Sequence, residues 1–181
     1  MLKACGLHFS VEPSGVDEEA LSTQLQGLSP GELAVALAQA KASAVSKNHP
    51  QAYVIGADQI CCLDGTIFSK PGTLENAEKQ LRALAGRKHQ QHCGAVILHN
   101  GKLVWQKAQE ATLTMRPLSH DSIRAYLTED KPLSSCGSYK FESLGRHLFS
   151  AADGDHDVIK GLPLLPLLNA LHELGVISLA T

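Results

Sequence analysis

Residues 54–71 read VIGADQICCLDGTIFSKP and combine a strand pattern, a turn pair and charges of both signs. The apolar start of this stretch, together with Tyr53, is rich in β-branched residues and predicts a short strand that is buried on both faces. Asp58 follows this strand, and Gly56 allows a close approach of backbone or ligand. A carboxylate at the C-terminal end of a buried strand lies where open α/β sheets place ligands and chemistry.

The second half of the stretch predicts a β-hairpin. Residues 59–68 form its two arms, and Asp64-Gly65 is a turn pair that accepts the positive φ angles of a tight loop. Lys70 follows the returning arm. The hairpin therefore predicts a cleft in which Asp58 binds a metal or takes a proton and Lys70 meets an anion.

Composition limits the classes of protein to which the chain can belong. The 181 residues are 44% hydrophobic, which is enough for a sizeable core, and the length favours a single domain over residues 1–181, either undivided or divided into two parts. The formal charge is -2, and aromatic residues make up 4% of the chain. Because there is no basic face with interleaved aromatics, we expect no nucleic-acid duplex as a partner, whereas a nucleotide remains a candidate ligand.

Cysteine usage and hydropathy predict the compartment. The cysteines include no C-x-x-C pair; they are Cys5, Cys61, Cys62, Cys93 and Cys136. An odd number without disulfide-like spacing indicates a reducing environment. No apolar run approaches the roughly 18 residues of a membrane span, and the N-terminus lacks the layout of a signal peptide. We therefore expect a soluble cytoplasmic protein without a membrane partner.

The rest of the chain alternates helix and strand patterns. Ser29, Pro30 and Glu32 combine an N-cap, a proline at the first helical position and a capping-box acid. The helix that they start runs to about residue 46, and Lys41 lies beside its apolar stripe, as surface lysines often do. The other expected elements are a helix end at 1–6, strands at 7–13, 93–98, 102–106 and 111–115, helices at 73–86, 119–127 and 161–175, and an irregular segment at 134–145. The mixture predicts an α/β or α+β sheet flanked by helices.

Three polar patterns have ordinary structural interpretations. Residues 17–19, DEE, are typical of a solvated helix start, where acids are favoured. His89 and His92 have zinc-like spacing but no further suitable ligand, so a surface pair at a helix-to-strand junction is the better interpretation. Residues 153–157, DGDHD, resemble a calcium loop only superficially, because the glycine at the sixth position and the glutamate at the twelfth are missing. We interpret them as a solvated turn.

Several motifs together resemble the Maf, or septum-formation-inhibitor-like, family of nucleoside triphosphate pyrophosphatases. Each motif alone is weak, but they occur in the family's order and spacing over nearly the whole chain. The motifs are VDE at 16–18, AKA at 40–42, IGADQ at 55–59, KP at 70–71, LAGRKH at 84–89, CGSYK at 136–140 with Glu142, and GLPL at 161–164. The resemblance implies a Maf/ITPase-like fold: a twisted mixed sheet flanked by helices, with a central nucleotide-binding cleft.

The resemblance also implies an activity. It is that of a cytoplasmic enzyme that cuts a nucleoside triphosphate between the α and β phosphates, with a divalent metal, Mg²⁺ or Mn²⁺, as cofactor. Asp58 matches the family's proposed general base, and Glu18 and Asp58 are the implied metal ligands. Lys41 and Lys70 would supply positive charge to the leaving pyrophosphate. Family members are often dimers, so the resemblance allows a homodimer.

Two further residues carry an implied substrate preference. Gln59 and Glu142 match the branch of the family that favours 7-methyl-GTP, whereas the pyrimidine-triphosphate branch typically has threonine and glutamine there. A carboxylate accepts hydrogen bonds from the guanine N1–H and amino group, so Glu142 suits a purine better than thymine or uracil. The substrate-binding residues implied by the resemblance are Glu18, Lys41, Gln59, Lys70 and Glu142.

The N-terminus departs from the family pattern. Family members open with an apolar strand, a Ser-x-Ser-x-x-Arg-like loop and a helix, and residues 1–6 resemble only the end of that helix. Loss of the strand exposes a sheet edge, and loss of the arginine removes a bidentate phosphate contact. Two explanations stay open. Either the true start lies upstream of Met1, which we favour, or the chain is a catalytically weak nucleotide-binding protein with a regulatory role in cell division.

Overall fold

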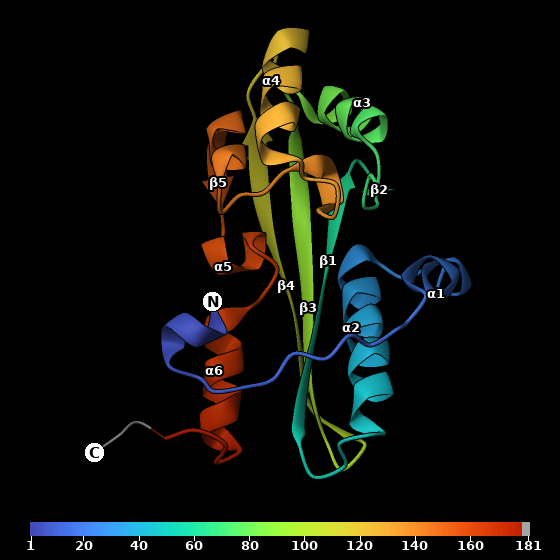
Figure 1. The fold of residues 1–181 in the computed structure, drawn as a ribbon, viewed down its shortest axis with the longest axis vertical. Coiled ribbons are helices and arrows are strands. Elements are labelled where there is room, and N and C mark those ends of the chain that lie inside the picture. Colours follow the sequence, from blue (N-terminus) through green and yellow to red (C-terminus); the bar gives the residue numbers. More distant parts are fainter. Residues whose placement is uncertain (179–181) are drawn as a thin grey trace. The chain divides into compact units, whose positions relative to one another are not determined.

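The computed structural model describes residues 1–178 (Figure 1). Its elements in chain order are η1 (Leu2–Cys5), α1 (Glu18–Gln24), α2 (Pro30–Ser46), β1 (Tyr53–Leu63), β2 (Thr66–Phe68), α3 (Leu74–Leu84), β3 (Lys88–His99), β4 (Lys102–Met115), α4 (His120–Asp130), η2 (Cys136–Ser138), η3 (Leu144–Leu148), β5 (Phe149–Asp153), α5 (His156–Ile159) and α6 (Leu164–Glu173). The strands follow the order β2-β1-β3-β4-β5. This sheet with its helices confirms the expected mixed α/β class.

The chain forms two compact units, and each draws on distant parts of the sequence. Among the described residues, the first unit comprises Met1–Asp58, Cys93–Gln109 and residues 161–178. The second unit comprises Gln59–His92 and Glu110–Lys160. Among residues 1–178, no helix is both long enough and apolar enough to cross a membrane.

Helix α2 of the first unit begins with the predicted capping box. The Ser29 hydroxyl accepts a hydrogen bond from the Glu32 backbone N–H, and the Glu32 carboxylate accepts one from the Ser29 N–H at 2.9 Å. Pro30 occupies the first helical position, as predicted. The helix then buries one face, which consists of Leu33, Ala34, Leu37, Ala38 and Ala42 together with Ser46.

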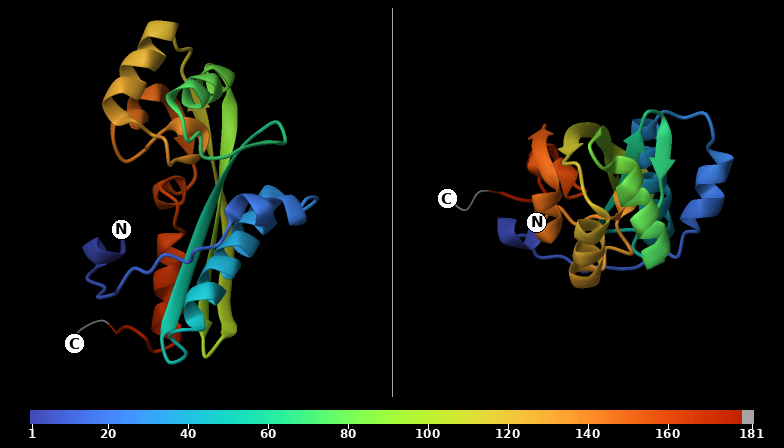
Figure 2. Two further views of the ribbon diagram at one scale, coloured as in Figure 1. Left: turned by 45° about the vertical axis from the view of Figure 1, so that its right-hand side comes forward. Right: turned by 90° about the horizontal axis from the view of Figure 1, so that it is seen from above.

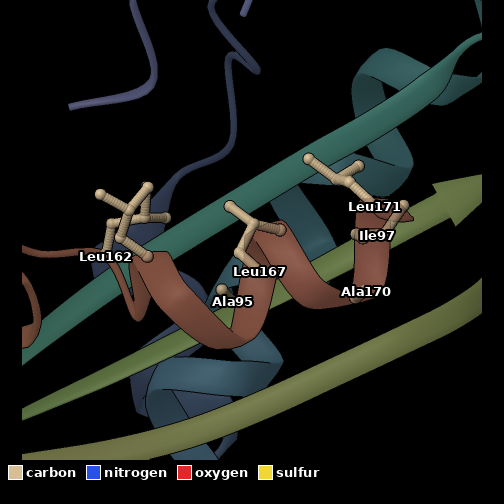
Figure 3. Close-up of a cluster of buried hydrophobic side chains, with 7 residues drawn as sticks. Ala95, Ile97, Leu162, Leu167, Ala170 and Leu171 are labelled. Carbon is tan, nitrogen blue, oxygen red and sulfur yellow. The ribbon is translucent and has the colours of Figure 1, made fainter. Parts of the chain in front are cut away.

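Successive side chains of β3 pack in turn against two different helices of the first unit, α6 and α2. Ala95 and Ile97 join a buried cluster with the leucines of α6 (Figure 3). Val96 and Leu98 belong instead to a cluster with the alanines of α2. Because successive strand side chains point to opposite faces, α6 and α2 cover opposite faces of this strand.

Two glycines let α2 approach the strands closely. A Cβ atom on Gly56 of β1 would lie 2.3 Å from the Ala38 carbonyl oxygen. A Cβ atom on Gly94 of β3 would lie 2.3 Å from the Val35 backbone nitrogen. Neither position accepts a side chain without movement of the helix backbone. The close approach predicted at Gly56 is therefore made by α2.

Replacing Leu167 of α6 with alanine is expected to destabilise the protein by about 3 kcal/mol, because the side chain is fully buried and its loss leaves a cavity. Urea unfolding followed by circular dichroism measures this loss. Leu165→Ala is the matched control, since Leu165 lies on the same helix and is 64% exposed. We expect that control to change stability by less than about 0.5 kcal/mol. Equal losses in both variants would contradict the packing of α6.

The second unit contains the predicted hairpin. β1 pairs antiparallel with β2, with Leu63 opposite Thr66, and both turn residues, Asp64 and Gly65, have positive φ angles. β4 pairs antiparallel with β5, and helices α3 and α4 pack side by side (Figure 2). The hairpin thus forms as its turn chemistry requires.

Predictions about two strands are wrong. Residues 7–13 have no regular secondary structure, and Val11 among them is 82% exposed, so the apolar alternation there is not matched by a partner strand. β1 does not end at Asp58 but continues to Leu63, so the carboxylate lies in the middle of an eleven-residue strand. The start of β1 is also not buried on both faces, because Tyr53 is exposed.

Other predictions differ in detail. His89 is fully buried and its Nε2 lies 2.9 Å from the Tyr139 hydroxyl, so it is not the predicted surface residue. The strands predicted at 102–106 and 111–115 are one continuous strand, β4. β5 and α5 were not predicted, because each has at most five residues and too short a pattern to detect.

Candidate active site

Three charged side chains meet in the first unit: Glu18, Lys41 and Asp58. Lys41 Nζ lies 2.5 Å from Asp58 Oδ1 and 2.9 Å from Glu18 Oε1. One ammonium group thus links two carboxylates that are far apart in the sequence. The structure brings together three of the residues that the sequence predicted for the site.

Strand alternation delivers Asp58 to this cluster. Val54 and Gly56 of β1 face α2, since Val54 packs against the α2 alanines and Gly56 lies against Ala38. Asp58 lies two further positions along the strand and therefore points to the same face. Lys41 follows Ala38 by about one helical turn, which places its side chain on the face of α2 that meets the strand.

Glu18 reaches Lys41 from a separate helix. It is the first residue of α1, and the N-cap side chain of Asp17 accepts a hydrogen bond from the Ala20 backbone N–H at 2.9 Å. The predicted helix start at residues 17–19 is therefore confirmed. α1 packs against α2, which brings the Glu18 carboxylate to the lysine.

The cluster is partly shielded from solvent. The exposed fraction of the side chain is 8% for Asp58, 19% for Lys41 and 34% for Glu18. Burial disfavours the charged lysine, but the hydrogen bonds and charges of Asp58 and Glu18 outweigh burial and raise the pKa of Lys41 above its ordinary value. The lysine therefore stays protonated at neutral pH and holds both carboxylates in place.

Cys93, a buried cysteine near Asp58, has an unreactive thiol. Burial, with the Asp58 charge as a smaller cause, raises the pKa of Cys93 to about 12. A thiol with such a pKa holds almost no thiolate at neutral pH, and the thiolate is the nucleophile. Cys93 is therefore not suited to act as a nucleophile at neutral pH.

A cavity of about 440 Å³ opens beside Lys41 within the first unit. Its walls include β1 residues 53–57, part of α2 and the N-terminal segment around Phe9 and Val11. A contact of 2.5 Å between His49 Nε2 and Glu12 Oε2 joins two residues of these walls. Lys41 therefore lines a cavity that it shares with the first residues of β1.

Gln59, Lys70 and Glu142 belong to the second unit. Gln59 Nε2 donates hydrogen bonds to two carbonyl oxygens of α5, that of Val158 at 3.0 Å and that of Ile159 at 2.8 Å. Lys70 follows β2, Glu142 lies between η2 and η3, and both residues are exposed. Since Asp58 belongs to the first unit, the cleft predicted to hold both Asp58 and Lys70 stays a prediction.

Asp58 and Glu18 are the oxygen donors that the cluster offers to a cation. Within residues 1–178, no group of three or more His, Cys, Asp or Glu side chains forms a ready-made metal site. Mg²⁺ does not need one, because it keeps several waters and is usually bound through one or two carboxylates and the substrate phosphates. The two carboxylates held on Lys41 therefore fit a divalent cation that keeps several of its waters.

Two amide side chains beside Lys70 were not predicted from the sequence. Asn76 Nδ2 donates to the Pro71 carbonyl oxygen at 3.1 Å, and Gln80 Nε2 donates to the Ser69 carbonyl oxygen at 2.9 Å. A signal was present, because two amides four positions apart on one helix share a face. The backbone groups that these amides bind depend on the packing of α3, and no local sequence pattern predicts that packing.

Comparison with known proteins supports the assignment of a family. A family model described as "Maf-like protein" matches residues 1–174. A protein from Legionella pneumophila is 42% identical over 179 residues, which cover 99% of this chain and 90% of the relative. A protein from Nitrobacter hamburgensis is 44% identical over 181 residues, with the same shares covered.

A third relative, from Rhodopseudomonas palustris, is 45% identical over 176 residues, which cover 96% of this chain and 87% of the relative. All three relatives carry the name nucleoside triphosphate pyrophosphatase. Identity at this level over nearly the full length of each chain agrees with the family model. The chain belongs to the family of Maf-like proteins.

Proposed function

We propose that this chain hydrolyses a nucleoside triphosphate to the nucleoside monophosphate and pyrophosphate. It is a nucleoside triphosphate pyrophosphatase, a hydrolase that acts on an acid anhydride, like the relatives that carry this name. The observation that carries the proposal is the cluster of Glu18, Lys41 and Asp58, with contacts of 2.9 and 2.5 Å to the lysine, in a chain of this family.

Asp58 acts as the general base in the proposed reaction. It takes a proton from a water molecule whose oxygen attacks the α phosphorus. The bond from that phosphorus to the bridging oxygen breaks, and its electron pair leaves with pyrophosphate. The Lys41 ammonium, 2.5 Å away, favours the ionised carboxylate and fixes its position. Both a base and a metal ligand need that ionised form.

Cations complete the proposed reaction. A divalent metal, Mg²⁺ or Mn²⁺, supplies charge neutralisation for the phosphates when it is bound, and Glu18 and Asp58 are the residues that would hold it. Lys41 and Lys70 are the protein's own cations for the triphosphate. A lysine suits this task because its ammonium donates three hydrogen bonds and neutralises charge on a leaving pyrophosphate.

The proposed substrate is a purine triphosphate of the 7-methyl-GTP type. Glu142 is exposed, so its carboxylate is accessible to a base, and it can accept two hydrogen bonds from the guanine N1–H and amino group. Gln59 supports the recognition indirectly, because its amide is bound to the carbonyl groups of α5. A threonine side chain, as in the pyrimidine branch, is too short to make both of these contacts.

Replacing Glu142 with glutamine is expected to lower kcat/KM for 7-methyl-GTP about tenfold, because one hydrogen-bond acceptor is lost and a donor faces the guanine amino group. Turnover of UTP is expected to stay within about twofold. Steady-state kinetics with both substrates measures this difference. Glu129→Gln, an exposed change on α4, is the control and should leave both rates unchanged. An equal decrease of kcat/KM for the two substrates would show that Glu142 does not recognise the base.

A panel of triphosphates tests the activity itself. Pyrophosphate release is measured from 7-methyl-GTP, GTP, UTP and dTTP with Mg²⁺ or Mn²⁺, and again after chelation with EDTA. We expect metal-dependent release that is fastest with 7-methyl-GTP. Binding of nucleotide without any turnover would contradict the proposal and favour a nucleotide-binding protein.

We also propose that the protein is cytoplasmic and forms a homodimer. All five cysteines are free thiols, which is typical of proteins in a reducing cytoplasm, where nucleoside triphosphates are made and used. The active assembly is a homodimer, as the resemblance allows. Light scattering during size-exclusion chromatography tests this, and a monomer at the concentration used for the kinetic assay would contradict it.

A further inference from the structure

The backbone on either side of Lys70 is held by side chains of α3. Gln80 Nε2 donates to the Ser69 carbonyl oxygen at 2.9 Å, and Asn76 Nδ2 donates to the Pro71 carbonyl oxygen at 3.1 Å. These two acceptors belong to the residues directly before and after Lys70. The lysine therefore lies between two fixed carbonyl groups, although it is outside any helix or strand.

A third contact fixes the end of the same segment. The Gly72 backbone N–H donates to the Leu133 carbonyl oxygen at 3.1 Å. Gly72 has a φ of 68°, a left-handed conformation that glycine adopts without strain. Pro71 before it is buried, and its ring fixes its own φ angle. The segment that follows β2 thus has one defined path past Lys70.

Gln80 also contacts a strained turn in the second unit. Its Oε1 accepts a hydrogen bond from the Ser138 hydroxyl at 2.6 Å. Ser138 is fully buried and has a φ of 62°, a conformation that a residue other than glycine keeps only where its surroundings enforce it. Helix α3 packs against η2, which contains this serine. One amide therefore joins the Lys70 segment to η2.

The chemistry of these contacts requires an amide of this length. Gln80 uses its donor on Ser69 and its acceptor on Ser138 at the same time. Glutamate cannot donate to the Ser69 carbonyl, and methionine, which has nearly the same shape, can neither donate nor accept strongly. A solvated glutamine on a helix surface makes its hydrogen bonds to water, whereas both ends of the Gln80 amide bind the protein.

We propose that Gln80 is a positioning residue for the hydrolysis, which acts by fixing the backbone that carries Lys70. The inference rests on the proposed function, in which Lys70 meets the triphosphate. A lysine side chain has four rotatable bonds, so an ammonium on a mobile backbone loses much freedom when it binds an anion. Clamping the backbone beforehand lowers that loss and places the charge where the pyrophosphate leaves.

Kinetics of single and double variants test the proposal. Gln80→Met is expected to lower kcat/KM for the triphosphate about tenfold, and Lys70→Ala about a hundredfold. In the Lys70→Ala background, Gln80→Met is expected to change kcat/KM by less than about twofold, because it acts through the lysine. Ala83→Met places the same side chain on an exposed position of α3 and should leave the kinetics unchanged.

Two measurements without turnover complete the test. In Gln80→Met, amide hydrogen exchange at Gly72 is expected to become about tenfold faster, because the segment opens locally. Calorimetric binding of inorganic pyrophosphate is expected to weaken in Gln80→Met and in Lys70→Ala but not in Ala83→Met.

Two results would overturn the inference: an equal loss from Gln80→Met with and without Lys70, or unchanged exchange at Gly72. If wild-type protein releases no pyrophosphate from any triphosphate, the proposed function fails and so does the catalytic role of Gln80. The exchange measurement still decides in that case whether Gln80 holds the segment.

Discussion

Replacement of Asp58 with asparagine is expected to lower kcat for triphosphate hydrolysis about a thousandfold, because the reaction loses its general base and one metal ligand. The two side chains have the same shape, and asparagine can still accept a hydrogen bond from Lys41. The fold should therefore survive the change, and KM should change less than kcat. Steady-state kinetics with the preferred triphosphate and saturating Mg²⁺ measures the effect.

A matched control separates the site from the general charge of the protein. Asp121→Asn makes the same chemical change at a fully exposed carboxylate in the first turn of α4. We expect its kinetics to match wild type within about twofold. If Asp58→Asn retained the kcat of this control, Asp58 would be neither the base nor an essential metal ligand.

Replacement of Gly94 with valine is expected to prevent stable folding of the first unit. A Cβ atom at this position would lie 2.3 Å from the Val35 nitrogen and 2.4 Å from the Ala34 carbonyl carbon, both of which are backbone atoms of α2. The helix would have to move away from β3, and overpacking that displaces backbone costs about 3 kcal/mol or more. Circular dichroism and urea unfolding of the purified variant measure the loss.

Gly31→Ala is the control for this steric argument. Gly31 lies in the first turn of α2, and the nearest atom to an added Cβ would be the Ala108 Cβ at 3.7 Å, an ordinary contact. Alanine is the better helix former, so this variant is expected to be as stable as wild type or more stable by about 0.5 kcal/mol. A well-folded Gly94→Val protein would show that α2 does not lie against β3 as described.

Local signals in the sequence predicted much of the fold correctly. The capping box at Ser29 and Glu32 fixed the start of α2, and Asp64-Gly65 predicted the hairpin between β1 and β2. These features depend on neighbouring residues, which a sequence displays directly. Residues 7–13 failed because alternation predicts a strand only where a partner strand exists, and that is a long-range property.

The same distinction explains what could be predicted about the site. Residue type and motif singled out Glu18, Lys41 and Asp58, but the sequence placed Asp58 at the end of a strand. β1 continues through it because a carboxylate paired with Lys41 does not need to leave the sheet for solvent. Gln80 escaped prediction, since its partners at Ser69 and Ser138 are joined to it only by tertiary packing.

Hydrolysis of the preferred triphosphate in ¹⁸O-labelled water tests the central claim most directly. The products are separated and analysed by mass spectrometry and ³¹P NMR. Attack at the α phosphorus predicts equal amounts of monophosphate and pyrophosphate, with one ¹⁸O atom in the monophosphate and none in the pyrophosphate. Release of orthophosphate, or ¹⁸O in the pyrophosphate, would contradict the reaction assigned to Asp58 and its neighbours.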